Sequence, residues 1–308
     1  MTGPAVLAGY AVAAGFLVPR VMCRGWATRA PRLAIGLWLA LAASWAVAIT
    51  AAGLALTVPS ALSWPGSPLP SAPGPLSPHG VPGGALGAAA GVLLATAAVR
   101  GCWFVASGLA RERRELREHG VLLDAAGRPD PAIGAIIVDH DRPAAYCLPH
   151  GRHRVVVSTA ALDLLPPAQL HAVLAHERAH LRGRHHVLLA VAAALAHAFG
   201  RIPLFALAGR QLPGLAEMAA DDAAARRHDP GELAAALVTL ARAGTQTAAL
   251  TAGGPAAMTR IQRLLAPPPQ PGLPARAGRL AAAATALALP VAIACIPLLV
   301  AACAAARI

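Results

Sequence analysis

The sequence predicts a predominantly α-helical integral membrane protein, with about four spans, that carries a small α+β domain. The chain of 308 residues is 56% hydrophobic, only 13% of it is charged, and its mean hydropathy is +0.56. Several apolar runs are long enough to cross a bilayer. Between Gly120 and Leu165 the composition changes to short strand-forming runs separated by turns, which indicates a part that folds in water.

Four apolar runs are the predicted spans. They cover residues 3–19, 33–58, 81–99 and 280–306. The first run has no basic residue before its apolar core, so we expect a retained anchor and not a signal peptide. The last run contains two prolines, which a spanning helix tolerates when its neighbours satisfy the freed carbonyl groups.

The distribution of arginine predicts the orientation, because the chain has no lysine and its 26 basic residues are all arginine. The segment between the first two spans is basic and should be cytoplasmic; it holds Arg20, Arg24, Arg29 and Arg32. The connection at 59–80 has no charged residue and seven prolines, so it should be a flexible outer loop. The third span leads into the arginine-rich segment 111–118, which we expect to be a cytoplasmic juxtamembrane helix.

The most informative motif is His176-Glu177-x-x-His180. Two histidines four residues apart on a helix project from one face and can bind a single zinc ion, and the glutamate between them can act as a base. A helix is expected here, because two prolines precede the segment and its apolar residues have helical spacing. The alternative is a pair of solvent-facing or capping histidines.

A catalytic zinc site normally has three protein ligands, and the predicted third ligand is Glu217. It lies 37 residues past His180, and no Asp or Glu intervenes. Asp221, one helical turn further on, is expected to accept the free ring N–H of a zinc-bound histidine. Asp222 is the alternative carboxylate ligand.

These residues predict peptide-bond hydrolysis. Zinc lowers the pKa of its bound water, and Glu177 would take the proton and return it to the leaving amine. The expected cofactor is therefore one Zn²⁺, and the expected partner is a protein substrate.

Three short runs predict a small antiparallel sheet before the motif helix. They are residues 133–138, 144–148 and 154–158. The edge of such a sheet can hold an extended substrate beside the metal. Alternatively, the sheet only packs against the motif helix.

The apolar stretch Val187 to Ala208 should not cross the membrane once, because a single crossing would separate Glu217 from the histidines. We expect it to lie on the membrane face or to enter and return as a hairpin. His185 and His186, just past the motif, are expected to be interfacial residues and not metal ligands. The charge rule then places residues 209–278 in the cytoplasm, with Arg226, Arg227, Arg242, Arg260, Arg263, Arg276 and, just beyond, Arg279.

The formal net charge of +12 does not indicate nucleic-acid binding. Most arginines flank apolar spans, where they determine topology and attract anionic lipid, and no basic patch interleaved with aromatic residues accompanies them. The five cysteines show no spacing typical of disulfides or of a cysteine metal site. The lipid bilayer and a protein substrate are thus the expected partners, and direct contact with nucleic acid is not expected.

The order of these features resembles the BlaR/MecR-type membrane metallopeptidases, the gluzincins of antirepressor signalling. The motifs that carry the resemblance are Arg154-Val155-Val156-Val157-Ser158-Thr159, His176-Glu177-x-x-His180 and Glu217-x-x-Ala220-Asp221. The sequence also resembles the HtpX-type membrane proteases, as a close second. The resemblance implies that His176, His180 and Glu217 bind zinc and that Glu177 is catalytic. Sensor members carry a penicillin-binding domain after the last span; the sequence ends at Ile308, so we do not expect β-lactam sensing through such a domain.

The expected organisation is three membrane helices in residues 1–109, a cytoplasmic zincin-like domain in 110–278 and a C-terminal membrane helix in 279–308. The expected function is that of a zinc endopeptidase in the plasma membrane, with its site on the cytoplasmic side. A transcriptional repressor is one candidate substrate, and membrane proteins undergoing quality control are another. The alternative from a different class is a non-catalytic membrane scaffold or sensor that retains zinc.

Overall fold

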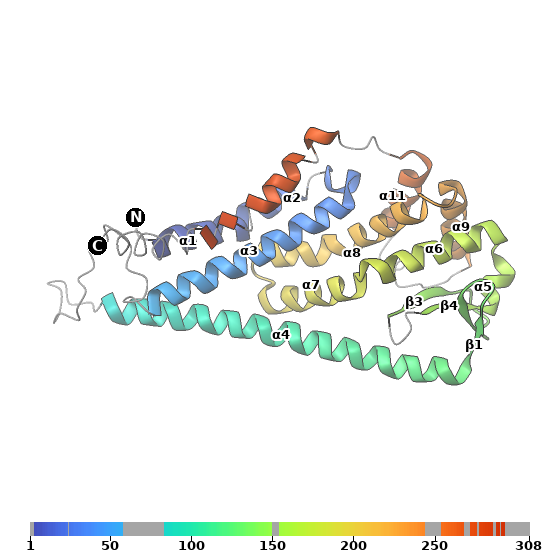
Figure 1. Ribbon diagram of the computed structural model, residues 1–308, viewed down its shortest axis with the longest axis horizontal. Helices are drawn as coiled ribbons and strands as arrows, with labels where there is room; N and C mark the ends of the chain where they lie inside the picture. The colour runs from blue at the N-terminus through green and yellow to red at the C-terminus, as the bar shows by residue number, and fades with distance from the viewer. Residues whose placement is uncertain are drawn as a thin grey trace, which may run out of the picture.

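The computed structural model describes residues 3–23, 25–57, 83–149, 154–243, 254–267, 272–275, 277–285, 288–289 and 291–292. Within these ranges the protein consists mostly of helices that run along one long axis, and a small sheet lies near one end (Figure 1). The predicted outer loop at 59–80 lies outside the described residues, and so does most of the predicted fourth span.

The helices have the following bounds. They are α1 (Gly3–Val12), the π-helix η1 (Ala13–Leu17), α2 (Val18–Met22), the 3₁₀ helix η2 (Ala27–Arg29), α3 (Pro31–Thr57), α4 (Gly83–Ala126), α5 (Thr159–Leu164), α6 (Pro167–Gly183), α7 (His185–Phe199), α8 (Pro203–Ala224), α9 (Pro230–Arg242) and α11 (Gly254–Leu265).

Two helices in the described part are long and apolar enough to cross a membrane, judged by length and composition. These segments are Pro31–Gly53 in α3 and Ala89–Ala126 in α4. The first predicted span corresponds to the shorter apolar helix Val6–Met22. The second and third predicted spans therefore meet the criterion in the structure, whereas a total of four spans stays a prediction.

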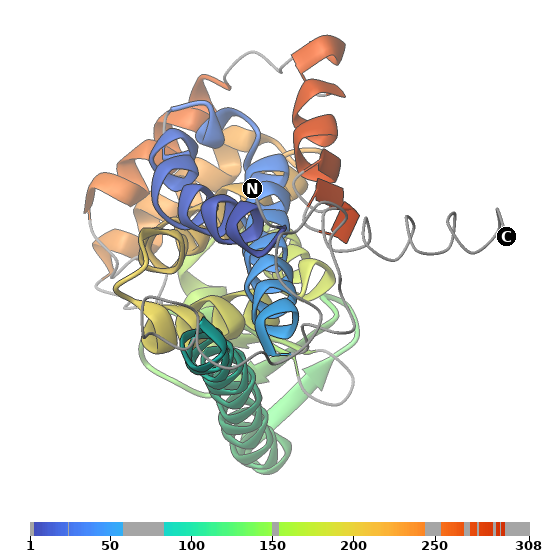
Figure 2. The same ribbon diagram turned by 90° about the vertical axis from the view of Figure 1, so that its left-hand side faces the viewer.

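Helix α4 is continuous from the predicted third span through the arginine-rich segment that follows it. It lies at the edge of the bundle in the end-on view (Figure 2). Its large apolar side chains Val92, Leu93, Val99 and Trp103 are exposed. Exposed apolar side chains on a long helix are consistent with contact with lipid, because their exposure to water is unfavourable.

The sheet has four strands in the order β1-β2-β4-β3. Its strands are β1 (Gly127–Asp130), β2 (Ala135–Val138), β3 (Ala145–Leu148) and β4 (Arg154–Ser158). The predicted antiparallel arrangement is wrong in one respect, because β2 and β4 are parallel, whereas β1–β2 and β3–β4 are antiparallel. The physical reason is that β4, whose valines are all buried, takes the central position between β2 and β3. Strand β1 was not predicted.

Local signals explain where the motif helix begins and ends. Ser158 caps α5 by accepting a hydrogen bond from the Ala161 N–H (3.1 Å). Pro167 is the first residue of α6, where its missing N–H costs no helical hydrogen bond. Arg184 has a φ of 49°, in the left-handed region, and its N–H closes the last turn of α6 before α7 begins.

The apolar stretch from Val187 to Ala208 forms a helical hairpin. Helix α7 runs away from the end of α6, the chain turns at residues 200–202, and α8 returns packed against α7 (Figure 1). Helix α7 also packs against α4, and α8 packs against α3 and α6. The hairpin therefore attaches the apolar helices to the helix that carries the motif.

The apolar interior falls into two main clusters. One lies between the sheet and helices α6, α9 and α11, with Val157, Leu174 and Leu233 almost fully buried. The other lies between α1, α3, α7 and α8, around Trp38, Leu204 and Phe205. The motif residues on α6 and the returning α8 lie where these two clusters meet.

Candidate metal centre

Helix α6 places the two motif histidines on one face, as their spacing of four residues requires. Their Nε2 atoms are 3.1 Å apart. His176 is buried, with 6% of its surface exposed, and His180 is partly buried. The two rings therefore point to a common position beside the helix.

Helix α8 brings Glu217 to the same position. One carboxylate oxygen, Oε2, lies 3.5 Å from His176 Nε2, and the other, Oε1, lies 3.5 Å from His180 Nε2. In the described part of the chain, these three residues form the one group of His, Cys, Asp or Glu side chains close enough to hold a metal ion.

The donor atoms fit a tetrahedral zinc ion. Ligands bound tetrahedrally at about 2.0–2.1 Å lie roughly 3.3–3.4 Å apart, close to the observed separations of 3.1, 3.5 and 3.5 Å. Glu217 Oε1, the oxygen nearer His180, has no cationic side chain beside it in the described part of the chain, whereas Oε2 is paired with an arginine. The donor set of two imidazoles and one carboxylate is also one of the ligand sets found in catalytic zinc sites.

Asp221 lies behind His176, one turn after Glu217 on α8. Its Oδ1 is 3.0 Å from His176 Nδ1, and only 1% of its surface is exposed. In a neutral imidazole, a carboxylate beside Nδ1 holds the proton there and leaves Nε2 to face the metal position. Asp221 is therefore close to the ring nitrogen that it was expected to contact, and its role in orienting a zinc ligand stays a prediction.

Arg260 on α11 joins the two carboxylates, a contact that was not predicted from the sequence. It donates from Nε to Asp221 Oδ2 and from Nη2 to Asp221 Oδ1, both at 2.8 Å, and its Nη1 lies 2.9 Å from Glu217 Oε2. Only 4% of its surface is exposed. The expectation that Arg260 simply follows the charge rule is incomplete, because its guanidinium is a buried partner of the site.

Asp222 points away from the metal position, so it does not replace Glu217. It pairs with Arg263 through Oδ1 (2.7 Å) and Oδ2 (2.9 Å). Arg263 also donates to the Thr28 carbonyl oxygen at 2.8 Å. This pair links α11 and α8 to the segment before α3.

Burial and the neighbouring charges shift the pKa values of the two histidines in opposite directions. Burial lowers the pKa of His176, but Asp221 and Glu217 outweigh burial and raise that pKa to about 10. Burial, reinforced by His176, lowers the pKa of His180 to about 3. In the metal-free protein His176 therefore holds a proton, which a cation must displace, and His180 is neutral.

The pKa values of the three carboxyl groups near the metal position also shift in opposite directions. Burial raises the pKa of Glu177 to about 7, with His176 opposing the rise and Glu217 adding to it. Burial also disfavours the charged form of Glu217, but His176 and Arg260 outweigh it and hold the Glu217 pKa below its usual range. For Asp221 the hydrogen bonds from Arg260 are the largest effect opposing burial, and its pKa is lowered too. Glu177 alone among the three can exchange a proton near neutral pH.

Two further residues adjoin the motif. Cys147 on β3 lies beside Glu177, and burial together with that carboxyl raises the pKa of its thiol to about 12. His185 is buried, with its Nδ1 3.1 Å from His180 Nδ1 and the two rings edge-on. That His185 lies at the membrane interface stays a prediction, but the structure adds a contact that was not expected, because His185 packs on the outer nitrogen of a candidate ligand.

Comparison with known proteins gives two matches. A family model, described as Peptidase family M48, matches residues 110–210. The Protease HtpX homolog of Acidiphilium cryptum (strain JF-5) is 36% identical over 90 residues, which are 28% of this chain and 30% of the relative. These matches support the M48 metallopeptidase family. The aligned part spans about a third of the relative's length, and no solved structure matches the chain.

The family match and the geometry are independent in one respect. The matched segment 110–210 includes His176, Glu177 and His180 but ends before Glu217. The position of Glu217 beside the histidines therefore comes from the fold of α8 alone. The match indicates a metallopeptidase; it does not name the antirepressor type, so the BlaR/MecR resemblance stays a prediction.

Proposed function

We propose that this protein is a membrane-bound, zinc-dependent endopeptidase, with one zinc ion held by His176, His180 and Glu217. The observation that carries the proposal is the convergence of these three side chains from α6 and α8, with Glu177 on the same helix. Bound zinc would supply the Lewis acidity that activates water and polarises a peptide carbonyl. Glu177 takes up the proton and delivers it to the leaving amine, because its pKa of about 7 allows both steps near neutral pH.

The charges of the cluster support a divalent cation. Glu177, Glu217 and Asp221 contribute three negative charges when ionised, and Arg260 contributes one positive charge. A dication with neutral histidines would make this buried cluster neutral, which removes the cost of burying unbalanced charge. A purely structural zinc site normally has four protein ligands, whereas the described residues supply three, so the open catalytic arrangement is preferred.

The sheet offers a place for the substrate. In the order β1-β2-β4-β3, strand β3 lies at the edge, and it packs against α6 beside the motif. An extended peptide that pairs with an edge strand is held by main-chain hydrogen bonds, independently of most of its sequence. We propose that β3 binds the substrate in this way and that Cys147, next to Glu177, lies under the scissile segment.

We also propose that residues 110–278 form the peptidase domain and that the site faces the cytoplasm. Three arginines, Arg20, Arg29 and Arg32, lie beside the start of α3, which is the end that the charge rule places inside. The substrate is then a cytoplasmic or membrane protein. A transcriptional repressor is the candidate that the antirepressor resemblance favours, and a membrane protein undergoing quality control is the second candidate.

Trapping substrates in cells tests the proposal. A Glu177→Gln variant should keep its zinc and accumulate uncut substrate, because the glutamine cannot move the proton. The matched control is Glu115→Gln, which changes an exposed glutamate on α4 and should cleave as the wild type does. If Glu177→Gln cleaved the captured proteins at the wild-type rate, the peptidase proposal would fail and a zinc-retaining scaffold would be the better description.

A further inference from the structure

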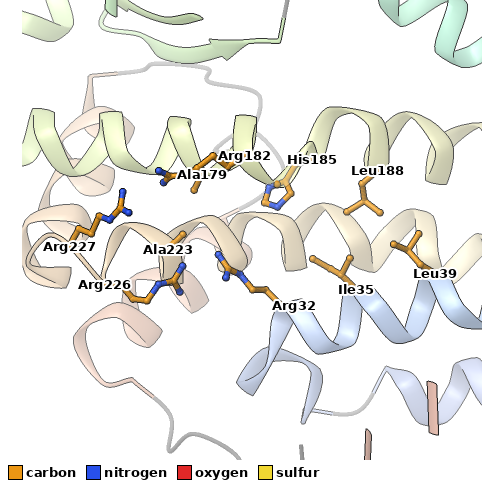
Figure 3. Close-up of a pocket in the computed structure, with 11 residues that line it drawn as sticks. Arg32, Ile35, Leu39, Ala179, Arg182, His185, Leu188, Ala223, Arg226 and Arg227 are labelled. Carbon is orange, nitrogen blue, oxygen red and sulfur yellow. The ribbon is translucent and has the colours of Figure 1, made fainter. Parts of the chain in front are cut away.

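A cavity of about 560 Å³ lies between helices α3, α6, α7 and the end of α8 (Figure 3). None of His176, Glu177, His180 and Glu217 lines it. Its volume is within the range of about 300–1,000 Å³ that is typical of small-molecule sites. The cavity is therefore large enough for a ligand and separate from the metal-binding residues.

Four arginines surround one end of this cavity and no acidic residue lines it. They are Arg32, Arg182, Arg226 and Arg227. Within the described ranges, Arg32, Arg182 and Arg227 form no ion pair, and Arg226 donates only to the Asp222 carbonyl oxygen (3.0 Å). The nearby Asp222 carboxylate is already bound by Arg263. Four cations around one cavity, with a single nearby carboxylate that is already paired with Arg263, favour an anionic ligand.

The other end of the cavity is apolar. Its lining there consists of Ile35, Leu39 and Leu188, and Figure 3 shows these side chains on one side of His185, with the guanidinium groups of the arginines on the other side. Along α3 the lining residues occur in the order Arg32, Ile35, Leu39, so the lining becomes apolar in the direction in which α3 enters its candidate span. The polarity of the cavity thus follows the polarity of a membrane surface, with charge outside and hydrocarbon inside.

We propose that this cavity binds one anionic phospholipid. The phosphate diester lies among the four arginines, and the glycerol and the first acyl carbons lie along Ile35, Leu39 and Leu188. Arginine suits this role because its guanidinium donates two parallel hydrogen bonds to phosphate oxygens. The site depends on α3 crossing the membrane but not on the proposed peptidase activity. Its wall includes His185, which contacts His180, so a single side chain separates the bound lipid from the metal-binding cluster.

Lipid binding to the full-length protein in detergent tests the proposal, with native mass spectrometry to count bound lipids. The probes are anionic phosphatidylglycerol and zwitterionic phosphatidylcholine with the same acyl chains. The test variant is Arg226→Gln with Arg227→Gln; both side chains are exposed, so the fold should be retained. The matched control removes two exposed arginines of α4 with Arg113→Gln and Arg117→Gln.

Wild type should bind one phosphatidylglycerol in preference to phosphatidylcholine. Each arginine near a lipid surface contributes about a five-fold gain in binding, so the test variant should bind phosphatidylglycerol roughly 25-fold more weakly. The control should stay within about two-fold of the wild type, because its arginines lie outside the cavity. Equal binding of the two lipids, or equal loss in the test and control variants, would overturn the proposal.

A second arm separates a lipid from free phosphate. Leu39→Gln alters the apolar end only, so it should weaken phosphatidylglycerol binding without changing the affinity for inorganic phosphate. Inorganic phosphate itself should displace the lipid only weakly, because it gains nothing from the apolar end. If inorganic phosphate or an acidic peptide displaced the lipid at equal concentration, and Leu39→Gln had no effect, the cavity would be a soluble-anion site and the lipid proposal would be wrong.

Discussion

Replacing Arg260 by glutamine should destabilise the metal-free protein more than the zinc-loaded protein. The guanidinium is 4% exposed and contacts Asp221 through two hydrogen bonds of 2.8 Å and Glu217 at 2.9 Å. Removing one partner of such a buried ion pair costs about 3–5 kcal/mol, because the remaining charge is left uncompensated. At roughly 2–4 °C per kcal/mol, the melting temperature should fall by about 6–20 °C.

Zinc should reduce this loss. In the metal-free protein, Arg260→Gln leaves Asp221 and Glu217 with the single charge of protonated His176 between them. Bound zinc brings two positive charges to Glu217, so the zinc-loaded variant loses less. Thermal unfolding in detergent, followed by tryptophan fluorescence with a chelator and then with zinc, measures the two losses. Arg260→Lys should show an intermediate loss, because a lysine keeps the charge but cannot make the forked contact to Asp221.

The control is Arg113→Gln, an exposed α4 residue, whose effect should be within about 0.5 kcal/mol. A melting temperature of Arg260→Gln equal to that of this control, in the presence of chelator, would show that the buried pair does not exist. An equal loss with and without zinc would show instead that Arg260 stabilises the α8–α11 contact independently of the metal position.

Four shorter predictions concern the same region. Purified protein should hold about one zinc by elemental analysis, and His176→Ala should remove most of it. Because the metal-free His176 has a pKa of about 10, zinc affinity should fall about ten-fold for each pH unit below that value, with one proton released per zinc in titrations at low buffer. Asp221→Asn should weaken zinc binding by a factor of roughly 10–100, whereas Asp222→Asn, which loses only its contact to α11, should not; the reverse order would refute the assignment. Single cysteines at Arg128→Cys and Gly231→Cys, in a cysteine-free background, should both resist an impermeant thiol reagent in intact cells, and labelling of the second alone would mean that the hairpin is a single crossing.

The local features of this fold could be predicted because short-range signals determine them. Pro167 begins α6, and the four-residue spacing places His176 and His180 on one face, so the predicted helix and the predicted pair agree with the structure. The apolar runs behind α3 and α4 are equally local, because length and hydropathy alone indicate them. The order of the strands was not predictable, since it depends on which strand is buried on both faces, and β4 was not distinguishable from β2 by its residues.

The contacts that complete the site come from distant parts of the chain. Arg260 lies 39 positions after Asp221 and 43 after Glu217, and neither spacing has a meaning within one helix. An arginine near a membrane protein's cytoplasmic side is ordinarily explained by topology, so nothing in the sequence distinguishes Arg260 from the other arginines. The contact of His185 with His180 was not predicted for a related reason. A residue just past a motif helix points to solvent or to the interior, depending on the direction of the next helix. Here the left-handed Arg184 turns α7 so that His185 packs on His180.

The position of Glu217, in contrast, follows from helix lengths once the hairpin is accepted. Helix α7 has 15 residues and so advances about 22 Å from His185 at 1.5 Å per residue. After the turn, the path from Pro203 to Glu217 along α8 covers 14 steps, or about 21 Å. The returning helix therefore brings Glu217 level with the start of α7, one turn from His180. Lengthening α7 by one turn while leaving α8 unchanged would shift the carboxylate by about 5 Å and separate it from the histidines. The matched lengths of α7 and of α8 up to Glu217 are therefore the physical reason why α8 can complete the ligand set that α6 begins.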